Sequence, residues 1–409
     1  MFRLPFAFII TGMISFVLFH LLTLADFAGW IAGEPESAKG WFHVHLLVLG
    51  WATMVAMGAV YQLINVVLQT ELHSRKLGWI HYGLFTVGTT GLLAGFRTVQ
   101  TQWIASFAVL AFAGIILFAW NIGATLWKAK QWNPVTISAA CAVGYLCLAA
   151  LSGMMMGLSF RFDILGELHE RWLGTHIWLG AVGWFGLLIT GFSYKLLPMF
   201  YLAHGYPVKL QQWVIIAWNA AVLLGAAGFL TGTRMLIDAA LLVLTAGLAF
   251  YNIHISQIAR HKHKKTPGAG IKWTVWSARL LLAVCAASTA AYLFNPKLAA
   301  DERIVVFVLW VYLYGWVAIT MMGYLSKIVP FLWWTHKYGP DAGKKKVPTM
   351  GQLLAEKPVH TGLSVVAIGL GGLLVGLGLD IASVITAAGS LLSAAAIVYM
   401  LMIARVFTR

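Results

Sequence analysis

The segment HVHLLVLGWATMVAMGAVYQLI, residues 43–64, decides the fold class of this chain. After its two leading histidines it contains no charged side chain. It is also as long as the roughly 20 residues that an α-helix needs to cross the hydrocarbon core of a bilayer. Its apolar residues do not alternate with period two, as those of a membrane-spanning strand would. The segment therefore predicts a membrane-spanning α-helix.

The composition extends this prediction to the whole chain. Of the 409 residues, 60% are hydrophobic and 10% are charged, and the mean hydropathy is +0.82. A soluble domain is about 45–50% apolar and about 25% charged, so disordered chains, small disulfide scaffolds and most soluble enzymes are excluded. We predict an all-α polytopic membrane protein with 12 transmembrane helices, at residues 4–24, 42–68, 78–96, 102–127, 134–157, 172–196, 210–231, 235–258, 272–294, 304–330, 359–378 and 382–405.

The basic residues predict the orientation in the membrane. All but seven of the 28 Lys and Arg residues fall on the side that carries both termini, including the runs 260–265 and 344–346. Because Lys and Arg are enriched in cytoplasmic loops, we expect both termini in the cytoplasm and a prokaryotic plasma membrane as the location. No A-x-A cleavage site follows the first apolar segment, which is therefore predicted to span the membrane. The net charge of +15 then reflects contact with the lipid bilayer, and we expect no nucleic-acid partner.

A dipeptide repeats at nearly equal intervals. Gly50-Trp51, Gly183-Trp184 and Gly315-Trp316 are 133 and 132 residues apart and lie in the second, sixth and tenth predicted spans. A repeat of about 130 residues that carries four spans predicts three four-helix units around a pseudo-threefold axis. We place them at residues 1–130, 131–262 and 263–409 of a single membrane domain, 1–409. Small residues on these helices would permit close packing.

The histidines are the main candidates for function. An ionisable side chain within a membrane is costly and marks a functional site by default. His43 and His176 each precede the repeated glycine by seven residues, so the two share one repeat position. Imidazole nitrogen suits haem iron, and two such helices could hold both faces of the macrocycle. The alternative for each histidine is a hydrogen-bonded packing residue. The candidate metal ligands are His20, His43, His45, His169 and His176.

Arginines at the outer helix ends are candidate partners for haem propionates, because a guanidinium can hold a carboxylate through two hydrogen bonds. Contact with lipid phosphate is the alternative interpretation. The candidates are Arg97, Arg171 and Arg303, with Arg161 and Arg234 at similar positions.

Residues 43–64 and HIWLGAVGWFGLLITGFSYKLLPMF at 176–200, together with the 12 spans and the threefold repeat, resemble the catalytic subunit of the haem-copper oxidases and nitric oxide reductases. The resemblance implies one or two haem b groups, with copper as a further metal. It implies a haem ligand at His43 or His45 and a copper ligand at His176. The family's paired histidines in the seventh helix are missing, since Trp213 stands there. Its H-x-H in the tenth helix is replaced by Val308 and Trp310.

The chain therefore resembles a degenerate member that lacks the ligands of an oxygen-reducing binuclear centre. We expect haem near the outer face, serving electron transfer or the binding of nitric oxide or another small gas, with an electron donor on that side. Whether the protein is an oxidoreductase is left open. The alternatives are a haem or copper transporter with a transient histidine site, and a scaffolding subunit of a respiratory complex.

Overall fold

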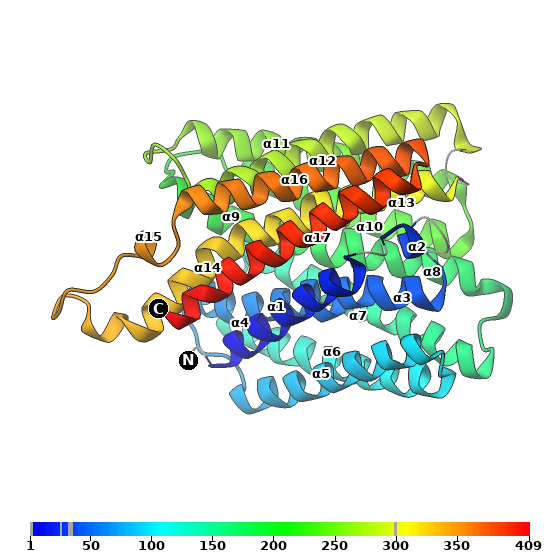
Figure 1. The fold of residues 1–409 in the computed structure, drawn as a ribbon, viewed down its shortest axis with the longest axis horizontal. Coiled ribbons are helices and arrows are strands. Elements are labelled where there is room, and N and C mark those ends of the chain that lie inside the picture. The colour runs from blue at the N-terminus through cyan, green and yellow to red at the C-terminus, as the bar shows by residue number, and fades with distance from the viewer. Residues whose placement is uncertain (1–2, 25–26, 32–35, 298–300) are drawn as a thin grey trace. The chain divides into compact units, whose positions relative to one another are not determined.

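A computed structural model describes residues 3–24, 27–31, 36–297 and 301–409, and Figure 1 shows its helices in chain order. These described residues form helices joined by short connections and contain no β-strand. The prediction of an all-α polytopic membrane fold is thereby confirmed.

The first half of the chain contains α1 (Arg3–Thr23), α2 (Phe27–Ile31), α3 (Ala38–His45), the π-helix η1 (Leu46–Thr53), α4 (Met54–Leu68), α5 (Arg75–Thr98), α6 (Thr101–Ala129), α7 (Pro134–Phe162), the short 3₁₀-helix η2 (Gly166–Leu168), α8 (His169–Trp178), the π-helix η3 (Leu179–Gly186) and α9 (Leu187–Tyr201). The second half contains α10 (Lys209–Thr231), α11 (Arg234–Arg260), α12 (Ala269–Phe294), α13 (Glu302–Trp310), the π-helix η5 (Val311–Ala318), α14 (Ile319–Lys337), η6 (Gly339–Asp341), α15 (Met350–Leu353), α16 (Glu356–Leu379), α17 (Ala382–Ala404) and η7 (Arg405–Thr408).

Eleven helical segments among the described residues are long and apolar enough to cross a membrane. The predicted third span, 78–96, is the one that falls short, although it does form a helix, α5, of 24 residues. Polar side chains such as His81, Thr86 and Thr89 lower its hydropathy relative to the other segments. The helix at this position is therefore confirmed, but its composition is less apolar than that of a typical span.

The second, sixth and tenth spans share a local distortion. Each changes from α- to π-helical geometry, at Leu46, Leu179 and Val311, four residues before the repeated Gly-Trp. π-Helical turns are rare and are frequently found at functional sites. These three spans are also the most buried, with 72%, 83% and 61% of the apolar window buried, whereas each of the other eight is at most 50% buried.

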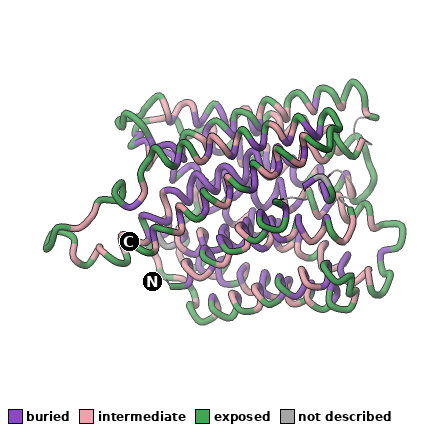
Figure 2. Tube along the Cα trace, in the orientation of Figure 1, coloured by how far each residue is buried: buried purple, intermediate pink, exposed green. Residues whose placement is uncertain are grey.

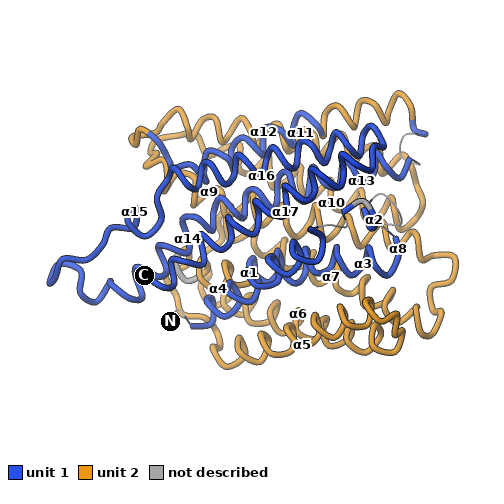
Figure 3. Tube along the Cα trace, viewed as in Figure 1, with its two compact units in different colours: residues 1–56, 266–284, 296–409 blue, residues 57–265, 285–295 orange. Residues whose placement is uncertain are grey.

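The chain divides into two compact units, which Figure 3 shows in different colours. Unit 1 comprises residues 1–56, 266–284 and 296–409, and in it α1 packs on η1 and α17 while α16 and α17 form a helical hairpin. Unit 2 comprises residues 57–265 and 285–295, and in it α5 pairs with α6, α10 pairs with α11, and α7 contacts α6, α8 and α9. The three predicted repeats stay a prediction.

Local sequence explains where several helices begin and how they pack. Ser74 caps α5 by accepting a hydrogen bond from the Leu77 amide at 3.1 Å, and Asn133 with Thr136 forms a capping box at the start of α7. Such caps contribute about 1 kcal/mol each. In unit 2, Gly191 lets its helix approach Ser138 so closely that a Cβ would collide with it. The three π-helical segments are mostly buried. Figure 2 colours the chain by the burial of each residue.

Candidate functional site

His43 lies near the end of α3, three residues before the π-helix η1, and only 6% of it is exposed. Its Nδ1 atom lies 2.7 Å from the carbonyl oxygen of Lys39. The ring stacks on Trp30, with centroids 4.9 Å apart and planes 8° from parallel. Phe42 and Phe19 meet it edge-on at 5.1 and 6.4 Å. His43 is therefore held in one orientation by an aromatic cluster of unit 1.

His45 follows on the same helix and is only partly buried. Its Nδ1 atom lies 2.8 Å from the carbonyl oxygen of Trp41, the same i−4 contact that His43 makes. A carbonyl oxygen accepts but cannot donate, so in both neutral rings the proton is on Nδ1 and the lone pair is on Nε2. This is the tautomer in which a histidine binds a metal through Nε2.

His176 occupies the equivalent position in unit 2, near the end of α8 and three residues before η3. Its Nδ1 atom lies 2.8 Å from the carbonyl oxygen of Ala149 and 3.4 Å from Oγ of Ser152, both on α7. A Cβ on Gly153 would lie 2.8 Å from Cε1 of the imidazole. Because the carbonyl fixes the proton on Nδ1, His176 adopts the same tautomer as His43, but its partner comes from a different helix.

Both ring nitrogens of His20 have side-chain partners. Nδ1 lies 3.1 Å from Oγ of Ser393 on α17, and Nε2 lies 2.9 Å from the hydroxyl of Tyr314 on η5. The ring is fully buried between Phe16 and Phe19. Binding a metal would require His20 to give up one of these hydrogen bonds. The observed contacts match the packing interpretation of this residue.

His169 is the first residue of α8, and its ring meets that of Phe160 edge-on at 5.5 Å. It lies seven residues before His176 along the chain. Arg171, two residues further on, is exposed, and its guanidinium lies beside Gly232 at the end of α10. Arg97 is exposed near the end of α5. These residues occupy helix ends, as the sequence predicts.

Arg303 is paired with carboxylates of its own unit. Its guanidinium lies 3.3 Å from Asp301 and 3.1 Å from Asp380. The hydrogen bond from Arg303 lowers the pKa of Asp301, which also caps α13. A propionate at this position would have to displace one of the two aspartates. Contact with a cofactor is therefore less favourable here than at Arg97 or Arg171.

The tenth span repeats the backbone of the site without its ligands. Val308 and Trp310 of α13 stand where the second span has His43 and His45. The Trp310 ring packs against Trp30 at 6.0 Å and against Tyr314 at 5.4 Å. The two indoles that fill this region, Trp30 and Trp310, cannot ligate iron.

Several residues of these surroundings are not singled out by the sequence. Trp30, Tyr314 and Ser393 contact His43 or His20 but lie far from them along the chain or outside the repeated pattern. The sequence also gives no sign that the carbonyl of Ala149 is the partner of His176. A clustered donor set is also missing: within the described residues no three His, Cys, Asp or Glu side chains lie close enough together to hold a metal ion.

Comparison with known proteins gives a distant relation. No family model matches the chain. It is 23% identical over 213 residues to cytochrome c oxidase subunit 1 of Rhodobacter capsulatus, which is 49% of this chain and 40% of that subunit. It is 25% identical over 333 residues to an uncharacterized protein of Aquifex aeolicus (strain VF5), 79% of each chain. The first match supports a distant similarity to an oxidase subunit, and the matched region spans less than half of that subunit.

Proposed function

We propose that this protein binds haem b in the membrane, with axial imidazole ligands drawn from His43, His45 and His176. Its role would be electron transfer or the reversible binding of a small gas such as nitric oxide. The distant similarity to cytochrome c oxidase subunit 1 supports an oxidase-like origin. The observation that carries the proposal is a hydrogen bond that the three imidazoles share. In each of them Nδ1 is bonded to a backbone carbonyl oxygen.

This arrangement suits axial ligation for a physical reason. A ligating histidine almost always donates its second ring N–H to a carbonyl or carboxylate, which fixes the ring and raises the basicity of the ligating nitrogen. The carbonyls of Lys39, Trp41 and Ala149 do this for the three candidates. A neutral imidazole is the form that binds iron.

When bound, haem supplies an iron centre that changes redox state or takes up a diatomic gas. The residues of this chain orient the imidazoles and exclude water. The π-helical segments η1 and η3 begin three residues after the ligand positions His43 and His176. In the tenth span, Val308 and Trp310 supply no ligands, so we propose no binuclear oxygen-reducing centre. Copper at His176 is the alternative metal assignment.

The proposal is tested by the haem content of purified variants expressed in a haem-replete host. The pyridine haemochrome assay, divided by protein concentration, gives the haem-to-protein ratio. We expect His176→Ala to lower this ratio at least fivefold, and His43→Ala or His45→Ala to do the same. His261→Ala is the control, because that exposed histidine lies in the basic loop. An unchanged ratio in all three variants would remove these residues as ligands, and copper without haem would favour the metal-carrier alternative.

A further inference from the structure

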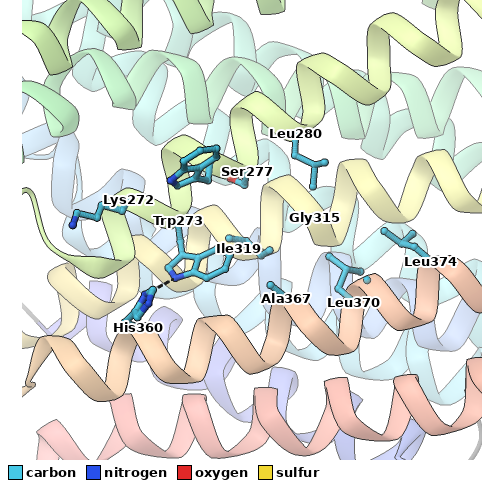
Figure 4. Close-up of a pocket in the computed structure, with 12 residues that line it drawn as sticks. Lys272, Trp273, Ser277, Leu280, Gly315, Ile319, His360, Ala367, Leu370 and Leu374 are labelled. Carbon is cyan, nitrogen blue, oxygen red and sulfur yellow. Dashed lines mark hydrogen bonds between the residues drawn. The ribbon is translucent and has the colours of Figure 1, made fainter.

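A groove within unit 1 has a volume of about 480 Å³ and lies among α12, the η5–α14 segment and α16. Its apolar wall includes Leu280, Ile319, Ala367, Leu370 and Leu374. Figure 4 shows these side chains along the groove, with the polar residues gathered at the opposite end from Leu374. The volume is within the range of about 300–1,000 Å³ of small-molecule sites. Its volume and apolar lining therefore suit a flexible apolar chain.

The polar end of the groove is built from Lys272, Trp273 and His360. Nε1–H of Trp273 donates to Nδ1 of His360 at 3.2 Å. In the neutral imidazole the proton is then on Nε2, which is a donor. The nearby Glu356 is occupied, since it pairs with Lys327 and accepts a hydrogen bond from the amide of Ala269. The polar groups that this end offers to a ligand are therefore the Nε2–H of His360 and the ammonium of Lys272.

A second cation lies deeper on the same face of α12. Lys272, Trp276 and Arg279 are spaced i, i+4 and i+7, so they share one side of the helix, and all three are exposed. The Arg279 guanidinium lies over the Trp276 ring, 5.1 Å from its centroid. Arg279 is ten residues, about 15 Å, beyond the start of α12, which is hydrocarbon depth. In the part of the chain that the structure describes, no ion pair joins Lys272 or Arg279 to an acid.

We propose that this groove binds one anionic phospholipid. Its phosphate lies between Lys272 and Arg279, and one of its acyl chains fills the groove. An exposed arginine at this depth needs an anionic partner, and basic pockets between membrane helices bind anionic head groups. A zwitterionic lipid would place its own cation against the two basic side chains, so it binds less well.

The size of the groove favours a lipid chain over a partner helix. A helix is about 10–12 Å across with its side chains and rises about 5.4 Å per turn, so 480 Å³ would accommodate only about one turn. An acyl chain is narrow and can follow the wall from Lys272 towards Leu374 (Figure 4). The lipid therefore accounts for the cations and the hollow together, whereas an acidic helix accounts only for the cations.

Photolabelling tests this proposal. The purified protein is equilibrated in detergent with phosphatidylglycerol that carries a photoreactive group in its acyl chain, irradiated and digested, and the labelled peptides are identified by mass spectrometry. We expect label on α12 and α16 that excess phosphatidylglycerol removes and excess phosphatidylcholine does not. Gly371→Leu should reduce this label at least fivefold, because a Cβ at Gly371 meets no atom within 4 Å and a larger side chain grows into the groove.

Gly378→Leu is the matched control, since Gly378 is on the same helix, has the same open surroundings and does not line the groove. It should leave the label unchanged. In the double variant Lys272→Gln with Arg279→Gln, the amount of phosphatidylglycerol label should fall at least fivefold. Gel filtration and thermal unfolding confirm that each variant is folded. Equal loss of label with excess phosphatidylcholine, or an unaffected Gly371→Leu variant, would overturn the proposal.

Discussion

The indole of Trp30 stacks on the imidazole of His43, with ring centroids 4.9 Å apart and an interplanar angle of 8°. The contact joins the short helix α2 to α3, and Trp30 is 2% exposed. By stacking on the face of the imidazole, Trp30 fixes the ring plane of His43, a proposed iron ligand. The first prediction follows from this relationship.

Trp30→Ala should destabilise the protein by about 3–5 kcal/mol, the usual cost of removing a large buried aromatic side chain. Trp30→Phe should cost less, because part of the stacking, worth about 0.5–1.5 kcal/mol, is retained. The midpoint of thermal unfolding measures both effects. Trp120→Ala is the control, since Trp120 is 67% exposed on α6. Equal losses for Trp30→Ala and Trp120→Ala would show that the stack contributes nothing.

Tyr314→Phe should destabilise the protein without loss of haem. The substitution removes the hydroxyl that lies 2.9 Å from Nε2 of His20 and leaves a buried ring nitrogen without that partner. The expected cost is about 1–3 kcal/mol. Thermal unfolding measures the cost, and the haem-to-protein ratio is the second readout. A large fall in haem content in the folded variant would show instead that His20 and Tyr314 belong to the cofactor site.

Gly153→Ala should weaken haem binding about tenfold. A Cβ at this position lies 2.8 Å from Cε1 of His176, so the imidazole must move. Overpacking typically costs about 1–3 kcal/mol, and a cost near 1.4 kcal/mol corresponds to a factor of ten. Haem titration of the purified protein measures the affinity. Gly144→Ala on the same helix is the control, because a Cβ there meets no atom within 4 Å, and equal affinities in the two variants would contradict the prediction.

The start of α13 should become less stable in acid. Arg303 lowers the pKa of Asp301 in the folded protein, so ionised Asp301 stabilises this state at pH values above its unfolded pKa of about 3.9. This stabilisation is lost as the pH falls through the lower, folded pKa. As the pH is lowered from 7 to 3, the midpoint temperature of thermal unfolding should therefore fall more steeply for the wild type than for Asp301→Asn. Parallel curves would show that the Asp301–Arg303 pair makes no pH-dependent contribution.

The predicted orientation can be tested by labelling with a membrane-impermeant maleimide in intact cells. The native cysteines Cys141, Cys147 and Cys285 are first replaced by Ser. Leu168→Cys, in the loop before α8, should then be labelled from outside. Lys264→Cys, in the basic run before α12, should react only after lysis. The reverse pattern would place both termini outside the cell.

The sequence was sufficient to predict the helices but not their π-helical segments. Apolar run lengths locate the helices, because every backbone group within a bilayer must be satisfied internally. The π-helical turns that begin at Leu46, Leu179 and Val311 cannot be predicted from the pattern of apolar residues. Only the repeated Gly-Trp indicates that the three helices are equivalent.

The candidate site was only partly predicted from the sequence. Repeat position identifies His43 and His176, since equal spacing from a glycine is visible in one sequence. The partners of His20 are not visible, because Tyr314 is 294 residues and Ser393 is 373 residues away along the chain. Such contacts depend on how α1, η5 and α17 pack, and no local pattern encodes that packing.

The most direct measurement of the central claim is the dithionite-reduced minus oxidised absorption spectrum of the purified wild-type protein, expressed with ample haem. Binding of haem b through imidazoles predicts a Soret band together with α and β bands, at a haem-to-protein ratio of at least one. A spectrum without haem bands, from protein that is folded and monodisperse, would contradict the account.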